Sequence, residues 1–393
     1  MKVLIYGEYF FPVIGGVQTF MDSLARGFSE CSRADGPNGS GPIDVTVVTN
    51  TPQGETNDSM LSYRVVRNPS LRELVRLIRK SDLVHVEGPC FLPMLISRMS
   101  GKPYIVEHHV YQAICPNGLL FKQPLQTACI GHYAKREYRQ CLRCCAATMG
   151  AGGAVRALLL SFPRHWLCKS ASVNIMVTNH VGRRLQMPRS QTIYHGIDEA
   201  PAKHARADAN DGAVVEFGYI GRLVAEKGLP LLVEAVNHLA KNGGCFRLSF
   251  IGDGPERAHL ETLVDQYELR ERVRFTGEMR GADFARVASE ITGVVMPSIW
   301  EETAGLAAIE QMMRGGLVIA ADIGGLGEIV DGAGLKFQAG DWRSLASAMQ
   351  RVIDDPSLAN SLGSAARTRA CALFRRDAMI ESQLSLCREI IAR

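Results

Sequence analysis

The sequence lacks the features that define several common classes of protein. No stretch of its 393 residues approaches the roughly 18 uncharged apolar residues of a membrane-spanning helix. The 44 Lys and Arg residues exceed the 40 Asp and Glu residues by only four, too small a surplus on a chain this long to indicate nucleic-acid binding. The hydrophobic share of 46% and the charged share of 21% exclude a disordered, collagenous or fibrous chain.

The sequence also lacks a convincing secretory leader. Its first 16 residues are mostly apolar, but they contain a single basic residue, Lys2, and Glu8 interrupts them. This segment is better explained as a buried first strand that runs into a glycine-rich turn. We therefore expect a cytoplasmic protein, with peripheral contact at the inner face of the membrane left open. Eleven cysteines are an odd number for a disulfide framework, so we expect them to be reduced.

Strand-like and helix-like patterns alternate through two parts of the chain, which predicts parallel, doubly wound sheets. In the first part, strands are expected at 3–6, 45–49, 63–67, 83–86, 104–106, 172–177 and 191–194, and helices at 17–30, 71–80 and 91–100. In the second part, strands are expected at 214–220, 248–251, 273–275, 294–296, 317–320 and 334–337, and helices at 229–241, 256–267, 305–314, 342–353, 357–371 and 376–392.

Three segments interrupt this alternation. Residues 32–42 are rich in Gly, Pro, Asn and Asp and predict an exposed loop, and the alternation fails between about 110 and 160. The polar, Ala- and Asp-rich segment 199–212 is the best linker candidate. The sequence therefore predicts an α/β protein of two doubly wound Rossmann-like domains facing a cleft, with ligands bound beyond the carboxyl ends of the strands.

The strongest chemical signal is a pair of glutamates around an expected helix start. Glu302 lies on the loop before the helix, and Glu310 lies inside the helix, about two turns past its start. The free N–H groups of Ala304, Gly305 and Leu306 would form an anion site between them, helped by the helix dipole. Carboxylates on both sides of a phosphate site suit a sugar nucleotide. The alternative is a solvated helix start with ordinary acidic residues.

A basic segment between another strand and helix supports the first interpretation. Residues 221–228, GRLVAEKG, place Arg222 and Lys227 just beyond an expected strand end. A guanidinium fork binds phosphate oxygens and a lysine supplies a mobile charge, so the two together would neutralise a leaving diphosphate. Taken alone, this segment is better explained as surface charge paired with Glu226.

Two weaker signals lie in the first half. Gly15 and Gly16 follow the first strand and begin the first helix, where glycine lets backbone amides approach a phosphate or a sugar. Such a pair is more often only a turn. His108 and His109 end the strand from 104, and successive strand residues point to opposite faces, so one of them is expected to face the cleft. The alternative role for that residue is a hydrogen-bonded structural histidine.

In this order, the motifs resemble the retaining glycosyltransferases of family 4, also called glycosyl transferases group 1, which have the GT-B fold. The resemblance extends over nearly the whole chain and is densest between 194 and 337. It is carried by YHGID at 194–198, GRLVAEKG at 221–228, IGDGPE at 251–256, the two-glutamate segment, GGLVIA at 315–320 and GGLGEIV at 324–330. The sequence departs from the family at His195, where Asn is usual, and at 302–306, where ETAGL replaces EGFGL.

The resemblance implies an activity and a division into domains. An acceptor-binding domain would span 1–198, with the last helix, 376–393, crossing back to it, and a donor-binding domain would span 199–375. A sugar would move from a nucleotide-sugar donor to an acceptor hydroxyl of a glycan, polysaccharide or lipid-linked molecule, with retention of configuration. No Asp-x-Asp motif is present, which fits a metal-independent enzyme without a catalytic cofactor. The alternatives are a sugar-nucleotide 2-epimerase and a non-catalytic nucleotide-sugar-binding protein of the same fold.

The resemblance also implies roles for particular residues. Arg222 and Lys227 would bind the donor diphosphate. Glu302 would contact the sugar hydroxyls, and Glu310 would bind the ribose hydroxyls. The amides of Ala304, Gly305 and Leu306 would hold phosphate, and Gly15 and Gly16 would approach the diphosphate from the other domain. The histidine that usually lies beside the reacting sugar corresponds to His109. Val110 stands where the family often has Asp, so the choice between His108 and His109 stays open.

The central cysteines predict one of two things. Cys115, Cys129, Cys141 and Cys144 have the spacing C-x13-C-x11-C-x2-C, and four thiolates can hold a structural zinc ion. Nearby basic residues would favour thiolates, and a metal would replace a missing core where the alternation fails. The alternative is a set of reduced structural cysteines, because only one of the two usual close pairs is present.

The segment 155–169 is the one place where membrane contact is suggested. Apolar residues stand there among Arg156, Arg164 and Lys169, as in a helix that lies on an anionic membrane. A core helix with basic edges explains the same pattern and is the favoured interpretation.

Overall fold

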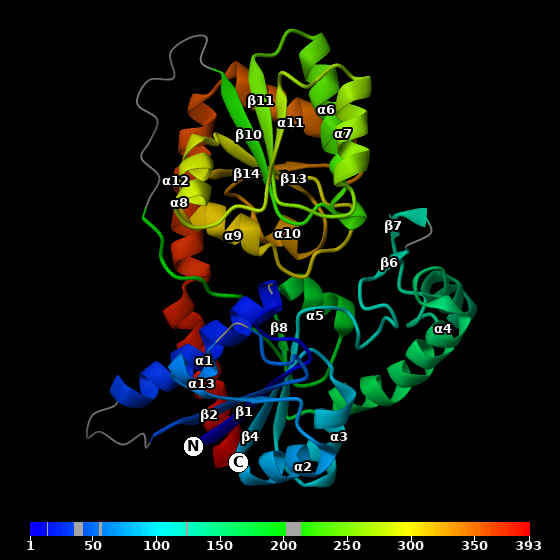
Figure 1. Cartoon of the computed structure of the whole chain (residues 1–393), viewed down its shortest axis with the longest axis vertical. Coiled ribbons are helices and arrows are strands. Elements are labelled where there is room, and N and C mark those ends of the chain that lie inside the picture. The colour runs from blue at the N-terminus through cyan, green and yellow to red at the C-terminus, as the bar shows by residue number, and fades with distance from the viewer. Residues whose placement is uncertain (14, 35–41, 55–56, 123–124, 202–213) are drawn as a thin grey trace. The chain divides into compact units, whose positions relative to one another are not determined.

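The computed structural model describes residues 1–13, 15–34, 42–54, 57–122, 125–201 and 214–393, which form two compact units (Figure 1). Unit 1 comprises Met1–Pro124, Cys129–Gly196 and Arg376–Arg393, and unit 2 comprises Leu125–Ala128 and Ile197–Arg375. Most of the predicted loop at 32–42 and of the predicted linker at 199–212 lies outside the described residues.

Unit 1 is built on a seven-stranded sheet with the order β3-β2-β1-β4-β5-β8-β9, in which every pair is parallel. Its strands are β1 (Lys2–Gly7), β2 (Asp44–Thr49), β3 (Arg64–Arg67), β4 (Leu83–Glu87), β5 (Tyr104–His108), β8 (Val173–Met176) and β9 (Ser190–Thr192). All residues of β4 and β5 are buried, as expected for parallel strands covered on both faces.

The helices of unit 1 are α1 (Gly16–Ala34), α2 (Leu71–Lys80), α3 (Phe91–Met99), α4 (Tyr138–Ser170), α5 (Asn179–Leu185) and α13 (Arg376–Ala392), with a 3-10 turn η1 (Asp58–Met60). The last helix belongs to this unit because its apolar face completes the unit's core. Ile380 and Leu384 of α13 share one hydrophobic cluster with Phe20 and Leu24 of α1 and Ile5 of β1.

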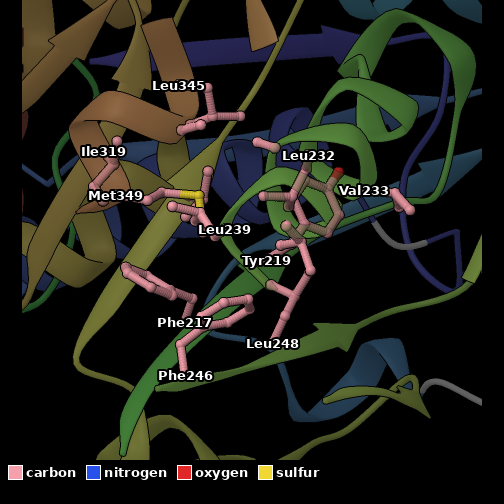
Figure 2. Packing of buried hydrophobic residues seen from close by; sticks show 14 of the residues in the cluster. Phe217, Tyr219, Leu232, Val233, Leu239, Phe246, Leu248, Ile319, Leu345 and Met349 are labelled. Carbon is pink, nitrogen blue, oxygen red and sulfur yellow. The ribbon is translucent and has the colours of Figure 1, made fainter. Parts of the chain in front are cut away.

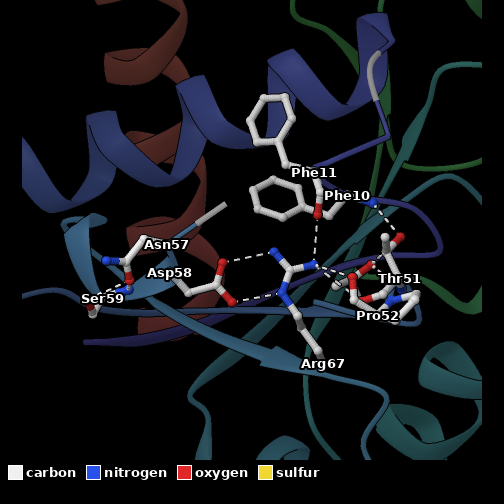
Figure 3. A network of polar contacts seen from close by, with 9 residues as sticks. Phe10, Phe11, Thr51, Pro52, Asn57, Asp58, Ser59 and Arg67 are labelled. Carbon is white, nitrogen blue, oxygen red and sulfur yellow. Dashed lines mark hydrogen bonds and ion pairs between the residues drawn. The ribbon is translucent and has the colours of Figure 1, made fainter. Parts of the chain in front are cut away.

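A buried arginine fixes the loop that leads from β1 to the glycine turn (Figure 3). Arg67 binds both carboxylate oxygens of Asp58, at 2.7 and 2.8 Å. Its guanidinium also donates to the carbonyl oxygens of Phe11 and Thr51, at 2.7 and 3.2 Å. Because Arg67 ends β3, the β1 loop is tied to the edge of the sheet just before Gly15.

The segment where the alternation fails contains a helical hairpin. The helix α4 has non-helical angles at Gly150 (φ 71°, ψ 170°), and the rings of Tyr138 and Phe162 lie only 5.3 Å apart. A straight helix would separate residues 24 positions apart by about 36 Å, so the two halves of α4 fold back on each other. Two short strands, β6 (Phe121–Lys122) and β7 (Thr127–Ala128), precede α4 in the chain.

By length and composition, α4 is the one helix among the described residues that could cross a membrane, and only 22% of its apolar window is buried. The sequence expectation missed this helix because it required an uncharged run, which Arg156 interrupts. Gly150 breaks the helix, so in this structure α4 is not one continuous rod.

Unit 2 repeats the arrangement with a six-stranded parallel sheet of order β12-β11-β10-β13-β14-β15. Its strands are β10 (Val215–Ile220), β11 (Phe246–Ile251), β12 (Val273–Gly277), β13 (Gly293–Met296), β14 (Leu317–Ala321) and β15 (Leu335–Phe337). Its helices are α6 (Leu229–Lys241), α7 (Arg257–Gln266), α8 (Gly281–Glu290), α9 (Leu306–Met313), α10 (Gly324–Ile329), α11 (Trp342–Asp354) and α12 (Ser357–Leu373), with a 3-10 turn η3 (Ala225–Lys227).

The core of unit 2 is a cluster of apolar side chains between β10, β11, α6 and α11. Phe217 of β10 and Phe246 of β11 place their ring centroids 6.3 Å apart, and Leu239 and Met349 from the two helices belong to the same cluster (Figure 2). This core holds the carboxyl end of β10 against those of its neighbours, where the sequence predicts the ligand.

Candidate functional site

In unit 2, the loops after β10 and β13 bring together two residues from separate motifs. The Lys227 ammonium nitrogen lies 2.8 Å from a carboxylate oxygen of Glu302. The two side chains are only 17% and 5% exposed. The hydroxyl of Ser298 donates to the same carboxylate oxygen, so Glu302 is held from two sides.

Two glycine turns hold the loop that carries Glu302. Gly228 has φ 64°, and a Cβ there would lie 2.3 Å from the carbonyl oxygen of Pro297. Gly324 has φ 65°, and a Cβ there would lie 2.6 Å from the backbone of Glu302. Only glycine fits both the positive φ and the close approach. The N–H of Gly325 donates to the carbonyl oxygen of Glu302 at 2.6 Å, and this hydrogen bond also fixes the position of the loop.

The start of α9 carries the backbone amides of the predicted anion site. The helix begins at Leu306, directly after this loop. Among the described residues, the amides of Ala304, Gly305 and Leu306 have no hydrogen-bond partner. The first N–H groups of a helix lack intrahelical partners, and the helix dipole adds partial positive charge there. These amides are therefore available to an anionic group.

Glu310 lies in α9 and is largely buried. Burial raises the pKa of its carboxyl group, and the nearby Arg314 partly opposes this rise. Within the described part of the chain, no hydrogen bond or ion pair to the Glu310 carboxylate is found. A largely buried carboxylate without a partner among the described residues suits the hydroxyl groups of a bound ligand.

Arg222 is placed differently from Lys227. Its side chain is 74% exposed, and its guanidinium lies 3.9 Å from the Glu226 carboxylate. The Tyr219 hydroxyl donates to the backbone carbonyl oxygen of Arg222 at 2.7 Å, so the backbone is fixed while the side chain extends into solvent. The structure thus joins Lys227 to Glu302 but leaves Arg222 outside that pair.

In unit 1, the two neighbouring histidines have different surroundings. His108 is fully buried, and its Nε2 lies 2.9 Å from the Asn174 side-chain oxygen. Burial lowers the pKa of His108 to about 4. His109 lines a cavity of about 600 Å³ that Gly7, Asn50, Pro93 and Arg164 also border. Of the pair, His109 is therefore the residue that a ligand in this cavity can reach. Gly15 and Gly16 belong to the same unit, with Gly16 as the first residue of α1.

His109 belongs to a buried network that sequence reasoning missed. Its Nε2 lies 2.6 Å from the Glu87 carboxylate, and its Nδ1 lies 3.1 Å from Nε2 of His195. The ring of His85 lies between Glu87 and Glu107, at 3.2 and 3.3 Å. The available signal was a glutamate and a histidine in each of two buried strands that are otherwise mainly apolar.

Opposing effects set the charges in this network. Burial alone would raise the pKa of Glu87, but His85 and His109 outweigh it and hold that pKa at about 2. Burial alone would lower the pKa of His85, but Glu87 and Glu107 outweigh it and raise that pKa to about 10. Burial and the neighbouring His109 lower the pKa of His195 to about 3, so His195 is neutral.

The donor atoms of two overlapping trios in this network lie within 4.8 Å of one another: Glu107, His109 and His195, and His85, Glu87 and Glu107. His109 is hydrogen-bonded on both ring nitrogens, to Glu87 and to His195. The ring nitrogens of His85 lie near Glu87 and Glu107 but make no hydrogen bond with them.

The four cysteines of the predicted zinc site are only partly gathered. Cys115 donates to the side-chain oxygen of Asn117 at 2.9 Å, and the Asn117 amide donates to Cys144 at 3.3 Å. Burial raises the pKa of Cys141 to about 12, and its nearby thiols, those of Cys115 and Cys129 first, add to that rise. Among the described residues, the cysteine sulfurs do not form a trio within 4.8 Å.

The profile of the family described as "Glycosyl transferases group 1" matches residues 203–369, which span the Lys227–Glu302 pair and α9. Alpha-D-kanosaminyltransferase of Streptomyces kanamyceticus is 27% identical over 338 residues, which cover 83% of this chain and 81% of the relative. Residues 203–369 of this chain thus match the glycosyl transferases group 1 family.

Other comparisons extend this result. The 2-deoxystreptamine glucosyltransferase of S. kanamyceticus is 35% identical over 166 residues, which span 41% of this chain and 43% of that protein. Sucrose-phosphate synthase from Thermosynechococcus elongatus superposes with a TM-score of 0.72 at 20% identity, covering 100% of this chain and 99% of that one. Anabaena HepE in complex with UDP superposes with a TM-score of 0.74 at 17% identity, covering 99% and 100%. The fold of this chain is GT-B. The family matched by residues 203–369 typically acts without a metal.

The acid stability of this glycosyltransferase should report the network around Glu87. The folded pKa of Glu87 is about 2 against an ordinary value of 4.5, so its charge stabilises the fold above pH 4.5, and this contribution is lost as the pH falls toward 2. We expect the gap in Tm between the wild type and Glu87→Gln to be largest near neutral pH and to narrow below pH 4.5. Glu381→Gln, an exposed change in the same unit, is the control. A gap that stays constant into the acid range contradicts the role given to Glu87.

Proposed function

We propose that this protein transfers a sugar from a nucleotide-sugar donor to an acceptor hydroxyl, with retention of anomeric configuration. The observation that carries the proposal is the Lys227–Glu302 pair beside the unpartnered amides at the start of α9. A cation, a carboxylate and an anion site within one pair of loops match the diphosphate and the sugar of such a donor.

Each residue has a step in this reaction. The diphosphate binds the amides of residues 304–306 and draws Lys227 from Glu302, which leaves the Glu302 carboxylate for the sugar hydroxyls. Glu310 accepts hydrogen bonds from the ribose hydroxyls, and the exposed Arg222 folds onto the phosphate oxygens. Lys227 stabilises the negative charge that grows on the diphosphate as it leaves.

The bond changes balance without a side-chain base. The acceptor oxygen forms a bond to the anomeric carbon on the face from which the diphosphate departs, while the bond between that carbon and the phosphate oxygen breaks. A phosphate oxygen takes the acceptor proton. We assign the acceptor to the cavity of unit 1, where Glu87 and His195 orient His109.

Incubation with UDP-, GDP- and ADP-sugars tests the function. UDP-glucose is the first choice, because HepE, a structural neighbour, was solved with UDP-glucose. We expect slow release of the nucleoside diphosphate from one donor, with the α-anomer of the sugar as the first product from an α-linked donor, and none with Lys227→Ala. A donor returned with an inverted C2 centre indicates an epimerase, and binding without turnover indicates a non-catalytic protein; both outcomes contradict the proposal.

We propose that the cysteine-rich segment holds a structural zinc ion bound by Cys115, Cys129, Cys141 and Cys144. The Asn117 side chain already contacts two of these thiols. Burial raises the pKa of Cys115 to about 11, and backbone N–H groups of residues 117, 118 and 120 partly oppose this rise. Loss of the thiol protons and a small movement of the loop would close a tetrahedral site.

Metal analysis of protein purified without chelator tests this proposal. We expect about one zinc ion per chain, by the four-ligand count of a structural site. Cys141→Ser should lose the metal and lower the Tm, whereas Cys245→Ser, which removes an exposed thiol of unit 2, should change neither. The proposal is contradicted if the wild type contains no metal and every thiol can be titrated after unfolding. In that case the cysteines are reduced structural residues.

We propose further that the second half of α4 lies on an anionic membrane. Val155, Leu159, Phe162 and Trp166 follow the helical spacing of one face and are 48%, 62%, 41% and 54% exposed. This favours the membrane interpretation of the segment over a core helix. Residues 138–197 also contain eight Lys and Arg residues and no Asp or Glu, which suits an acidic lipid surface.

Sedimentation with lipid vesicles tests this contact. We expect the wild type to sediment with vesicles that contain phosphatidylglycerol, less with pure phosphatidylcholine, and less again in high salt. The double variant Leu159→Gln, Trp166→Gln should stay in the supernatant, and Leu71→Gln, an exposed change on α2, should bind like the wild type. Equal sedimentation of the double variant and the wild type contradicts the proposal.

A further inference from the structure

The cavity of unit 1 has a basic wall that the reaction above does not use. One face of α4 supplies Arg156, Leu160 and Arg164 to the lining, and His109 lies in the same lining. Residues four apart in a helix share a face, so the two guanidinium groups stand on the same side, two turns apart. The other walls come from the loop after β1 and from the start of α3, and they are largely apolar.

Arg164 is a partly buried cation that has no hydrogen bond or ion pair among the described residues. Its Nε is buried and makes no hydrogen bond in the described part of the chain. Burial lowers the pKa of Arg164, and no carboxylate of the described residues lies within 4.0 Å of it. A buried charge is costly unless an opposite charge or hydrogen bonds compensate for it. An anion bound from outside the chain would therefore compensate the positive charge of this wall.

The acidic groups of the cavity do not compensate the charge of Arg164. Glu87 is already bound to His109 and His85. Glu8 is exposed and accepts a hydrogen bond from the Asn50 amide at 3.3 Å. Glu8 acts on Arg164 only at a distance, and more weakly than the thiols of Cys90 and Cys168. Neither Arg156 nor Arg164 therefore forms an ion pair with Glu8 or Glu87.

We propose that this cavity binds an anionic group of the acceptor, a phosphate or a carboxylate, with Arg164 as its main partner and Arg156 at the opening. This inference rests on the proposed function and narrows it, because the acceptor class becomes an anionic glycan or glycolipid rather than a neutral one. The guanidinium fork binds phosphate and carboxylate oxygens in pairs, which would fix the acceptor's orientation relative to His109.

Titration calorimetry with inorganic phosphate, in the presence of saturating UDP to fill the donor site, tests this inference. We expect the wild type to bind phosphate in the millimolar range and Arg164→Gln to bind it at least about tenfold more weakly, as for the loss of a charged hydrogen bond. Arg156→Gln should show a smaller loss. Arg139→Gln, an exposed change in the first half of α4 that lies outside the cavity lining, should match the wild type.

A second arm uses farnesyl phosphate in place of inorganic phosphate. Tighter binding of farnesyl phosphate, lost in Arg164→Gln, identifies a lipid-linked anion, whereas equal binding of the two probes identifies a soluble one. Equal phosphate binding by the wild type and Arg164→Gln, or none by the wild type, overturns the inference. If Arg164→Gln does not fold, Arg156→Gln and Arg164→Lys supply the comparison, with Arg164→Lys expected to keep most of the binding.

Hydrolysis of the nucleotide-sugar donor separates this inference from the proposed function. The arginines lie in unit 1 and the proposed donor residues lie in unit 2, so the phosphate titration of the arginine variants and the donor hydrolysis of the wild type are separate readouts. If the wild type hydrolyses the donor but binds phosphate no better than Arg164→Gln, only the anion site is contradicted. Absent hydrolysis in the wild type defeats the proposed function, whatever the phosphate titration gives.

Discussion

Replacement of Lys227 by alanine is expected to lower kcat by about 100- to 1,000-fold, the range seen when one preorganised donor to a developing charge is removed. The rise in KM should be smaller. Negative charge grows on the diphosphate as it leaves, so the Lys227 ammonium stabilises the transition state more than the bound donor. Steady-state kinetics with the identified donor measure both parameters.

Two controls keep this result specific. Lys241→Ala removes an exposed lysine at the end of α6 and should leave kcat unchanged. Loss of Lys227 also leaves Glu302 with Ser298 as its remaining partner, so the Tm of the variant must show that the loop still folds. A variant with wild-type kcat and only a higher KM would show that Lys227 binds the substrate and takes no part in the departure of the diphosphate.

Replacement of Glu310 by alanine is expected to weaken nucleotide binding by roughly 1.5–3 kcal/mol, the scale for losing a charged hydrogen bond. This corresponds to about tenfold to over a hundredfold in Kd. The Glu310 carboxylate is largely buried and has no partner in the described part of the chain, so its loss leaves no other group unpaired. Calorimetry with the correct nucleoside diphosphate measures the change.

The ribose gives this prediction a second readout. The wild type should bind the 2′-deoxynucleotide more weakly than the ribonucleotide, and Glu310→Ala should bind the two nearly equally. Glu271→Ala, an exposed change in the same unit, should keep the full difference. A folded Glu310→Ala variant that keeps both the wild-type affinity and the preference for the ribonucleotide rules out a contact between Glu310 and the ribose.

The sheets could be predicted from the sequence because parallel strands buried on both faces are continuous apolar runs. The strands from β1 to β5 and from β10 to β15 lie within a few residues of their predicted positions. The helix α10 was missed because three of its six residues are glycine, which has a low helix propensity. The hairpin of α4 was missed because the reversal depends on one backbone angle at Gly150.

The site was predictable only where it consists of local motifs. The glutamates of 302–310 and the basic residues of 222–227 are each close in sequence, and the structure adds the contact between Lys227 and Glu302. The network around His109 depends on register: β4 pairs Glu87 with Glu107 of β5, and His85 is two residues away on the same face. Cysteine spacing gives the number of available ligands, but the distances between sulfurs depend on how the loop folds.

The glycine turns at Gly228 and Gly324 limit how this enzyme can change. They clamp the loop between Pro297 and Glu302 through backbone contacts that a single methyl group would block. Laboratory evolution toward another donor sugar should therefore find its useful variation in side chains such as Thr303 and Ala304, and almost none at the two glycines. In a library that randomises all of these positions together, most variants would be unable to form the loop.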